Sequence, residues 1–107
     1  MWLQYVGYFL GGAFLTNSIP HIVSGVMGRA FQTPFAKPPG RGLSSSTINV
    51  LWGFFNLTLA YVLICRVGNF DPRAWDALAA GLGALAMGLF SARTFGELHG
   101  GNSPSRS

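Results

Sequence analysis

Three long apolar runs, separated by two polar segments, dominate the pattern of hydrophobic and polar positions along the chain. The runs cover about residues 2–28, 46–66 and 72–95, and a polar loop covers residues 29–45. A helix needs about 20 apolar residues to cross a bilayer, and each run reaches that length. The sequence therefore predicts an all-α membrane protein, a small bundle of three transmembrane helices.

A polar stretch from Thr16 to His21 interrupts the first apolar run, and it contains Pro20. Proline has no N–H and crowds the carbonyl four residues earlier, so we expect the first helix to be kinked or broken near Pro20. An amide such as Asn17 and the imidazole of His21 are costly in lipid unless they meet partners. We therefore expect the other helices to be arranged around this stretch.

The predicted second and third helices each have a recognisable start. Ser46 or Thr47 is expected to cap the second helix, because serine and threonine hydroxyls accept hydrogen bonds from the first free N–H groups. Asp71 is expected to cap the third helix, with Pro72 at its first position. The link over residues 67–72 is short, which predicts that these two helices are antiparallel neighbours.

Small residues recur at four-residue spacing on two of the predicted helices. Such positions let two backbones approach closely, which is a main source of helix association in lipid. A seam between copies of the chain is one interpretation of the third-helix ridge, and a surface on which the first helix packs is the simpler one. The residues are Gly7 and Gly11 on the first helix and Ala80, Ala84 and Gly88 on the third.

The loop over residues 29–45 is too rich in proline and glycine for a regular helix. Its aromatic side chains are expected at the headgroup level, and its basic side chains are expected to meet anionic lipid or a partner protein. These loop residues are Arg29, Phe31, Phe35, Lys37 and Arg41.

The chain has 107 residues, of which 9% are charged, against about 25% in a typical soluble domain. This length allows one small domain, which we assign to residues 1–99, followed by a disordered tail over residues 100–107. The net charge of +4 comes from residues placed between apolar runs and not from a basic stripe, so nucleic acid is not an expected partner. A single cysteine, Cys65, excludes a disulfide within the chain.

The distribution of basic residues predicts an orientation, since cytoplasmic loops carry an excess of Lys and Arg. The loop and the tail contain most of them, so both are expected in the cytoplasm and the N-terminus outside. The basic residues on the predicted cytoplasmic side are Arg29, Lys37, Arg41, Arg93 and Arg106, and those on the other side are Arg66 and Arg73.

Polar residues from all three predicted helices fall at similar depth, toward the cytoplasmic end. With a rise of 1.5 Å per residue from Trp2, Asn17 lies roughly 22 Å and His21 roughly 28 Å into the membrane. The predicted intramembrane cluster consists of Asn17, His21, Asn49, Trp52 and Asn56, with Arg93 and Glu97 as charges at the cytoplasmic end. Arg93 and Glu97 are four apart and are expected to pair.

This cluster supports several interpretations. Asparagines inside a bundle commonly join helices by hydrogen bonds, and this interpretation competes with a ligand site. No metal-ligand spacing, nucleophile motif or phosphate-binding loop is present, so we expect no metal, no cofactor and no enzyme activity. The sequence favours a structural or accessory subunit that binds the bilayer and either a larger membrane protein or itself. A small oligomeric transporter or channel is the alternative, and a cofactor or small-ligand binder that uses His21 is a third.

Overall fold

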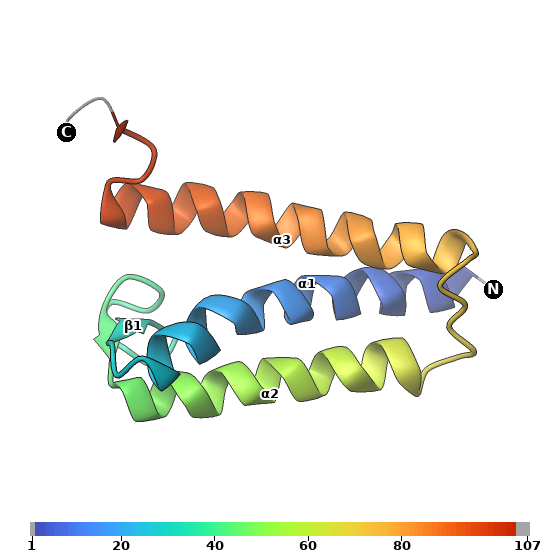
Figure 1. Ribbon diagram of the computed structural model, residues 1–107, viewed down its shortest axis with the longest axis horizontal. Helices are drawn as coiled ribbons and strands as arrows, with labels where there is room; N and C mark the ends of the chain where they lie inside the picture. The colour runs from blue at the N-terminus through green and yellow to red at the C-terminus, as the bar shows by residue number, and fades with distance from the viewer. Residues whose placement is uncertain (1, 105–107) are drawn as a thin grey trace.

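The computed structural model describes residues 2–104, which form three helices and one short β-ladder (Figure 1). The helices are α1 (Trp2–Val26), α2 (Ser46–Cys65) and α3 (Trp75–His99), and the strands are β1 (Phe31–Gln32) and β2 (Leu43–Ser44). The strands pair antiparallel, with Phe31 opposite Ser44. The connection between α1 and α2, which the sequence predicted as a loop, is therefore a small hairpin.

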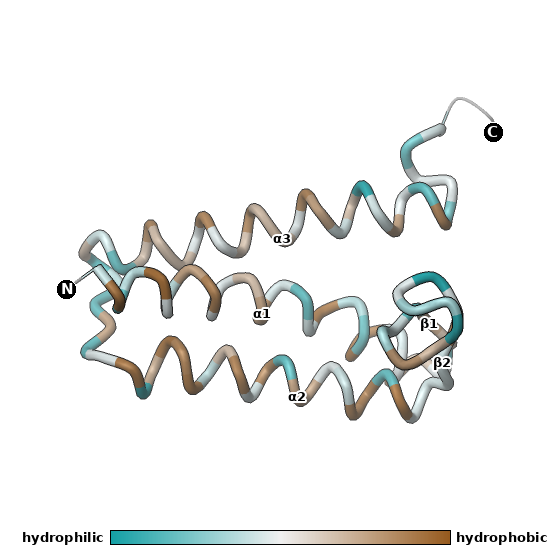
Figure 2. Tube along the Cα trace, turned by 180° about the vertical axis from the view of Figure 1, so that it is seen from behind, coloured by the Kyte–Doolittle hydropathy of each residue, from teal (hydrophilic) through white to brown (hydrophobic). Residues whose placement is uncertain are grey.

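The three helices form a layer with α1 in the middle (Figures 1 and 2). α1 packs along its length against both α2 and α3, whereas α2 and α3 scarcely touch each other. The prediction that the second and third helices are neighbours is therefore wrong, although they do run antiparallel. The link over residues 66–74 is longer than predicted, and it crosses the end of the layer beside the start of α1.

Glycines on two faces of α1 explain its central position. Gly7 and Gly11 lie against Leu63 and Ile64 at the end of α2 and against Val67 just after it. Gly12 faces α3 so closely that a Cβ atom there would overlap the carbonyl oxygen of Ala80. Two helices can approach the backbone of α1 from opposite sides because neither meets a side chain at these points.

The small residues of α3 that the sequence singled out lie along α1. Ala80 and Ala84 contact Gly12 through their backbones, and Thr16 is the nearest neighbour of Gly88. The tightest contact involves Gly83, where a Cβ atom would overlap the carbonyl oxygen of Phe9. The four-residue spacing did not include this glycine.

α1 runs through Pro20 without a break, so a broken helix, one of the two predicted outcomes, is wrong, and the kink stays a prediction. Proline removes one hydrogen bond from the helix, to the carbonyl of Thr16. A helix of 25 residues that packs on both sides is held by many other contacts, and it tolerates this loss.

The predicted caps of the second and third helices are both wrong, although α2 begins at Ser46 as predicted. Ser45, not Ser46 or Thr47, caps α2, and its hydroxyl accepts a hydrogen bond of 3.2 Å from the Ile48 N–H. α3 begins at Trp75, after Ala74, and not at Pro72. The Asp71 carboxylate instead accepts from the Arg73 N–H at 2.9 Å, which closes a turn before the helix.

The end of the chain folds back beside α3 as far as it is described. Gly100 ends the helix with a positive φ of 78°, and the Asn102 amide donates to the Ala92 carbonyl at 3.3 Å. The last part of the tail predicted to be disordered, residues 105–107 with Arg106, lies outside the described residues.

Burial in this fold is the reverse of that in a soluble protein. Large apolar side chains cover the outside, with Trp75 73% and Leu89 63% exposed, whereas Asn49 and Asn56 are completely buried. In the part of the chain that is described, α2 and α3 are long and apolar enough to cross a membrane. Only 22% of the apolar stretch of α2 and 6% of that of α3 are buried, unlike the core helices of a soluble protein, which are mostly buried.

The contact between Gly83 and α1 provides a stability test with an internal control. Gly83→Ala should lower the free energy of unfolding by about 1–3 kcal/mol, because the added methyl meets backbone that cannot move aside. A Cβ atom at Gly81, two residues away, would meet nothing within 4 Å, so Gly81→Ala should leave stability unchanged or raise it by about 0.5–1 kcal/mol. Unfolding of the purified variants in detergent measures both effects, and equal stability of the two variants would contradict the close α1–α3 contact.

Candidate functional site

Polar side chains from α1 and α2 meet between these helices at the end that carries the hairpin. His21 Nδ1 lies 2.8 Å from Asn49 Oδ1, and Asn17 Nδ2 donates to Asn56 Oδ1 at 3.0 Å. The Asn56 amide also donates to the Trp52 carbonyl at 2.8 Å. The structure thus brings together the five residues that depth and helical spacing had grouped.

Asn49 connects this cluster to the hairpin. Its Nδ2 lies 3.1, 3.2 and 3.0 Å from the backbone carbonyl oxygens of Phe31, Ser44 and Ser45. Two of these carbonyls belong to paired strand residues and the third to the residue that caps α2. One buried amide therefore holds both strands of the hairpin and the start of α2 in place.

The same contacts determine which nitrogen of His21 carries the proton in the neutral ring. The Asn49 NH₂ group must face the three carbonyls, because an oxygen there would meet only other acceptors. Asn49 Oδ1 therefore faces His21 and accepts from Nδ1–H. In neutral His21, Nε2 is left with a free lone pair.

Glycines allow the helices to meet closely around this cluster. A Cβ atom at Gly53 of α2 would lie 2.9 Å from the Ile22 backbone nitrogen, and one at Gly25 of α1 would lie 2.8 Å from the Ser46 carbonyl oxygen. Both contacts flank the pair formed by His21 and Asn49. Close backbone approach makes short hydrogen bonds possible between side chains as small as asparagine.

Aromatic rings surround His21 on its remaining sides. The ring centroids of Phe31, Trp52 and Phe95 lie 5.5, 6.4 and 6.5 Å from that of His21, and all three contacts are edge to face. His21 itself is only 2% exposed. The imidazole is therefore shielded from solvent by rings from the hairpin, α2 and α3.

Several residues of the site were not predicted. The hairpin contributes Gln32, whose Oε1 lies 2.9 Å from His99 Nε2, and Thr33, whose hydroxyl bonds to that of Ser44. Gln32 and Thr33 are buried, at 6% and 1% exposure. Their place depends on a hairpin that the proline- and glycine-rich sequence did not reveal.

A cavity of about 180 Å³ lies beside His21. Its walls are Asn17 and His21 of α1, Trp52 of α2, Phe90, Thr94 and Phe95 of α3, and residues between 32 and 40 of the loop. All three helices and the loop thus share one small space, which is lined by amide, hydroxyl and aromatic groups and by no charged side chain.

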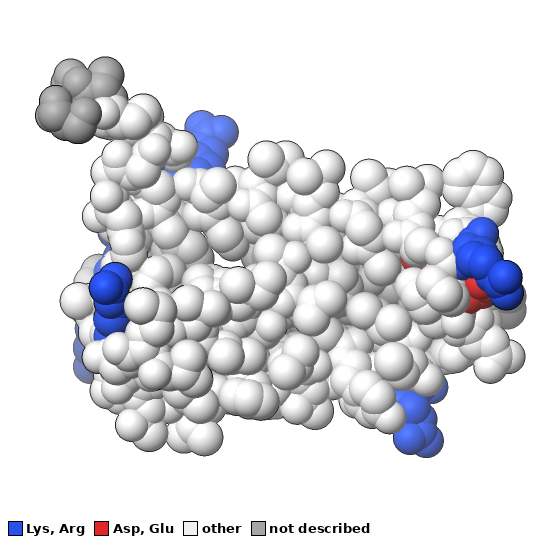
Figure 3. All heavy atoms as spheres, in the orientation of Figure 1, with Lys and Arg blue, Asp and Glu red and all other residues white. Residues whose placement is uncertain are grey.

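The predicted charges at this end of the molecule lie outside the cluster. Arg93 and Glu97 are not buried in it, and the described part of the chain contains no ion pair between them. Arg29, Lys37 and Arg41 lie on the surface of the loop. Figure 3 shows basic groups at both ends of the layer, with none over the middle of the face in view.

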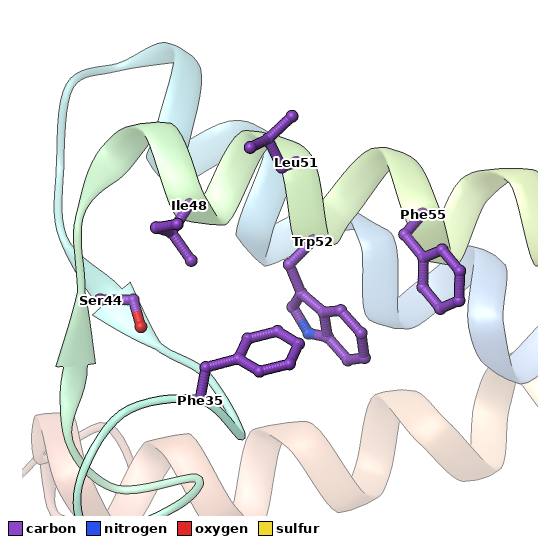
Figure 4. A pocket seen from close by; sticks show the side chains of 6 residues that line it. All are labelled: Phe35, Ser44, Ile48, Leu51, Trp52 and Phe55. Carbon is purple, nitrogen blue, oxygen red and sulfur yellow. The ribbon is translucent and has the colours of Figure 1, made fainter.

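The outer side of α2 carries a wider groove of about 620 Å³, which opens to the surroundings (Figure 4). Phe35 reaches across from the loop and packs edge to face on Trp52, with ring centroids 5.0 Å apart. Ile48, Leu51 and Phe55 form the rest of the wall, with Ser44 at one end. The groove is almost entirely apolar, in contrast to the cavity on the other side of Trp52.

No protein family, curated protein or solved structure shows significant similarity to this chain.

The role of Asn49 can be tested by comparing it with Asn56. Asn49→Leu should free the hairpin, because it leaves His21 Nδ1–H and the hairpin carbonyls without a buried partner, at about 1–3 kcal/mol for each unsatisfied group. Trypsin should then cleave after Arg29 and Arg41 faster, by about tenfold for each 1.4 kcal/mol lost. Asn56→Leu removes an equally buried amide that does not touch the hairpin, so it should leave both cleavage rates unchanged. Equal cleavage of the two variants would show that Asn49 does not hold the hairpin.

Proposed function

We propose that the chain is an integral membrane protein with three spans, in which α1 crosses the bilayer between α2 and α3. All three helices are long enough, since 20 residues extend about 30 Å and the hydrocarbon core is about 30 Å thick. The polar side chains of α1 that would oppose insertion lie against α2, where Asn17 and His21 are hydrogen-bonded. An exposed hydroxyl on α2, that of Thr58, donates to the Phe54 carbonyl of its own helix at 2.9 Å. Polar groups satisfied in this way are compatible with lipid.

We further propose that the hairpin and the C-terminal end of α3 face the cytoplasm and the N-terminus faces outside. Arg29, Lys37, Arg41 and Arg93 support this orientation, against Arg66 and Arg73 at the opposite end. The same opposite end exposes Trp2, Tyr61 and Trp75, by 68%, 54% and 73%. Amphipathic aromatic rings of this kind favour the boundary between membrane and water.

Labelling of single cysteines tests both the number of spans and the orientation. In a Cys65→Ser background, Asn69→Cys should react with a membrane-impermeant maleimide added to intact cells, since the link over residues 66–74 is expected outside. Ala30→Cys, at the start of the hairpin segment, should react only after the membrane is permeabilised. The reverse pattern would overturn the orientation, and labelling of both positions from outside would overturn the three spans.

Within the membrane, we propose that the protein acts as a structural or accessory subunit that docks on another transmembrane helix through α3. The observation that carries this proposal is the one-sided packing of α3, which contacts α1 and buries, among its residues, Gly83 alone. On that free surface, a Cβ atom at Gly81 would meet nothing within 4 Å. Ala77 and Gly81, with Ala84 and Gly88 at the border with α1, form a shallow strip along which a partner helix can approach closely.

A pair of substitutions on α3 tests this docking surface. Gly81→Leu should reduce the recovery of a stoichiometric partner, or of a second tagged copy, from native membranes in mild detergent, because the added side chain separates the helices. Ala86→Leu makes a similar change on another side of α3, about 140° around the helix, and should leave recovery unchanged. Equal recovery with both variants, or no stoichiometric partner with either, would contradict docking through this surface.

An oligomeric transporter or channel is the alternative function, and it predicts a measurable flux. Purified protein in liposomes would then carry an ion or solute flux, and Asn17→Leu would abolish that flux. The absence of carboxylates from the middle of the helices disfavours proton coupling, which usually needs an acidic group within the membrane.

A further inference from the structure

We propose that the cavity beside His21 binds a small neutral phenol, a single aromatic ring whose hydroxyl donates a hydrogen bond to His21 Nε2. This inference goes beyond the proposed docking role and does not depend on the surface of α3. It rests on the protonation pattern of His21, on the chemistry of the cavity walls and on the size of the cavity.

His21 Nε2 has a free lone pair. Asn49 is held by three backbone carbonyls, and its Oδ1 accepts from His21 Nδ1–H, so Nε2 of the neutral ring can only accept a hydrogen bond. None of the described residues supplies a donor to Nε2, although the residue is only 2% exposed. Nε2 is not among the fully buried side-chain atoms that lack a partner, so its lone pair stays accessible to an occupant of the cavity that brings a donor.

The described walls of the cavity carry no charged side chain. The described walls of the cavity contain amides, hydroxyls, aromatic rings and one imidazole, and no carboxylate, lysine or arginine. No group of three or more metal-ligating side chains exists among residues 2–104. An ionic ligand would therefore enter without a counter-charge, which is unfavourable in a buried site. A neutral donor such as a hydroxyl avoids this cost.

The size of the cavity fits a single aromatic ring. A volume of about 180 Å³ slightly exceeds the roughly 150 Å³ of an apolar cavity known to hold benzene. It is well below the roughly 300–1,000 Å³ of pockets for drug-sized ligands, which excludes a macrocycle such as haem. Trp52, Phe90 and Phe95 supply aromatic walls that favour another ring through edge-to-face contacts. One ring with one hydroxyl matches the space, and its hydroxyl can donate to the free lone pair of His21 Nε2.

Phenol and toluene form the matched pair of probes. They have nearly the same size, and toluene carries a methyl group where phenol carries the hydroxyl. The experiment uses the full chain labelled with ¹⁵N-histidine in phospholipid nanodiscs, with a His99→Asn sample to assign the two imidazole signals. Phenol should produce a saturable upfield shift of the His21 Nε2 resonance, since a hydrogen bond to the lone pair causes such a shift. Toluene should leave that resonance unchanged. Equal shifts with both probes, or no saturable shift with phenol, would overturn the proposal.

A variant that fills the cavity tests its location without disturbing His21 and Asn49. Thr94→Phe places a ring into the space from α3, and it should abolish the phenol shift while the Nδ1 signal stays at its wild-type position. A phenol shift that persists in Thr94→Phe would show that binding occurs elsewhere and would overturn the assignment to this cavity. Substitution of His21 itself is less informative, because it leaves Asn49 Oδ1 without a donor.

A third probe separates two sources of the same chemistry. 4-Octylphenol carries the phenol head on an acyl-like tail, as a membrane-dissolved phenolic lipid would. A saturable shift with both phenols supports the site and admits ligands from the bilayer, whereas a shift with phenol alone supports the site for free, water-soluble phenols. If the proposed docking of α3 fails while the phenol shift is observed, the binding site stands by itself.

Discussion

The structure depends on the rule that a polar group placed among apolar surroundings must have a hydrogen-bond partner, and Asn49 is where most of those partners meet. Its side chain is completely buried, and it accepts from His21 of α1 while it donates toward both strands of the hairpin and the cap of α2. In lipid, no water is available to replace any of these contacts. The hairpin, the end of α1 and the start of α2 are consequently coupled through one amide.

Glycine makes this arrangement of helices possible. Gly25 and Gly53 bring α1 and α2 close enough for short side chains to bond at one end, while Gly12 and Gly83 bring α1 and α3 together further along. Because α1 has close contacts on two sides, the three helices form a flat layer and not a closed bundle. In a flat layer, α2 and α3 each pack on one side only, and their other sides are the surfaces that lipid and the proposed partner would cover.

The three helices and the polar cluster could be predicted from the sequence. The helices follow from the length of the apolar runs, and the cluster follows from the depth of each polar residue along its helix. Asn17, His21, Asn49 and Asn56 were grouped by counting residues from the two helix ends, and the structure places them in two hydrogen-bonded pairs. The order of the helices in the layer could not be predicted from the sequence. A short link allows the two helices that it joins to be neighbours, but it does not require this. Gly83 makes the tightest backbone contact between α1 and α3, and no four-residue repeat along the sequence indicates it.

The loop was the least predictable region, and the reason is physical. Proline and glycine exclude a helix, but they do not specify which carbonyls of the loop turn inward. Asn49 selects those carbonyls, and with them the burial of Gln32 and Thr33. The caps of α2 and α3 differ from prediction for a related reason. Both were assigned from residue type alone, whereas the surrounding turns decide which hydroxyl or carboxylate meets a free N–H.

The members of the polar cluster differ in whether all their hydrogen-bonding groups have partners within the protein. Members with all groups partnered join the helices, whereas a member with a free group can also bind a ligand. The Asn17 and Asn56 amides bond to each other, and Asn56 also bonds to its own helix, so this pair acts as a connection between α1 and α2. Asn49 uses both of its groups on the protein. His21 alone combines a nitrogen held by the protein with a second nitrogen that has a lone pair to offer, and it borders a cavity that three helices and a loop build together. A residue needed only to join helices has no use for an accessible acceptor at a cavity, so His21 is the place where the structure departs from simple packing.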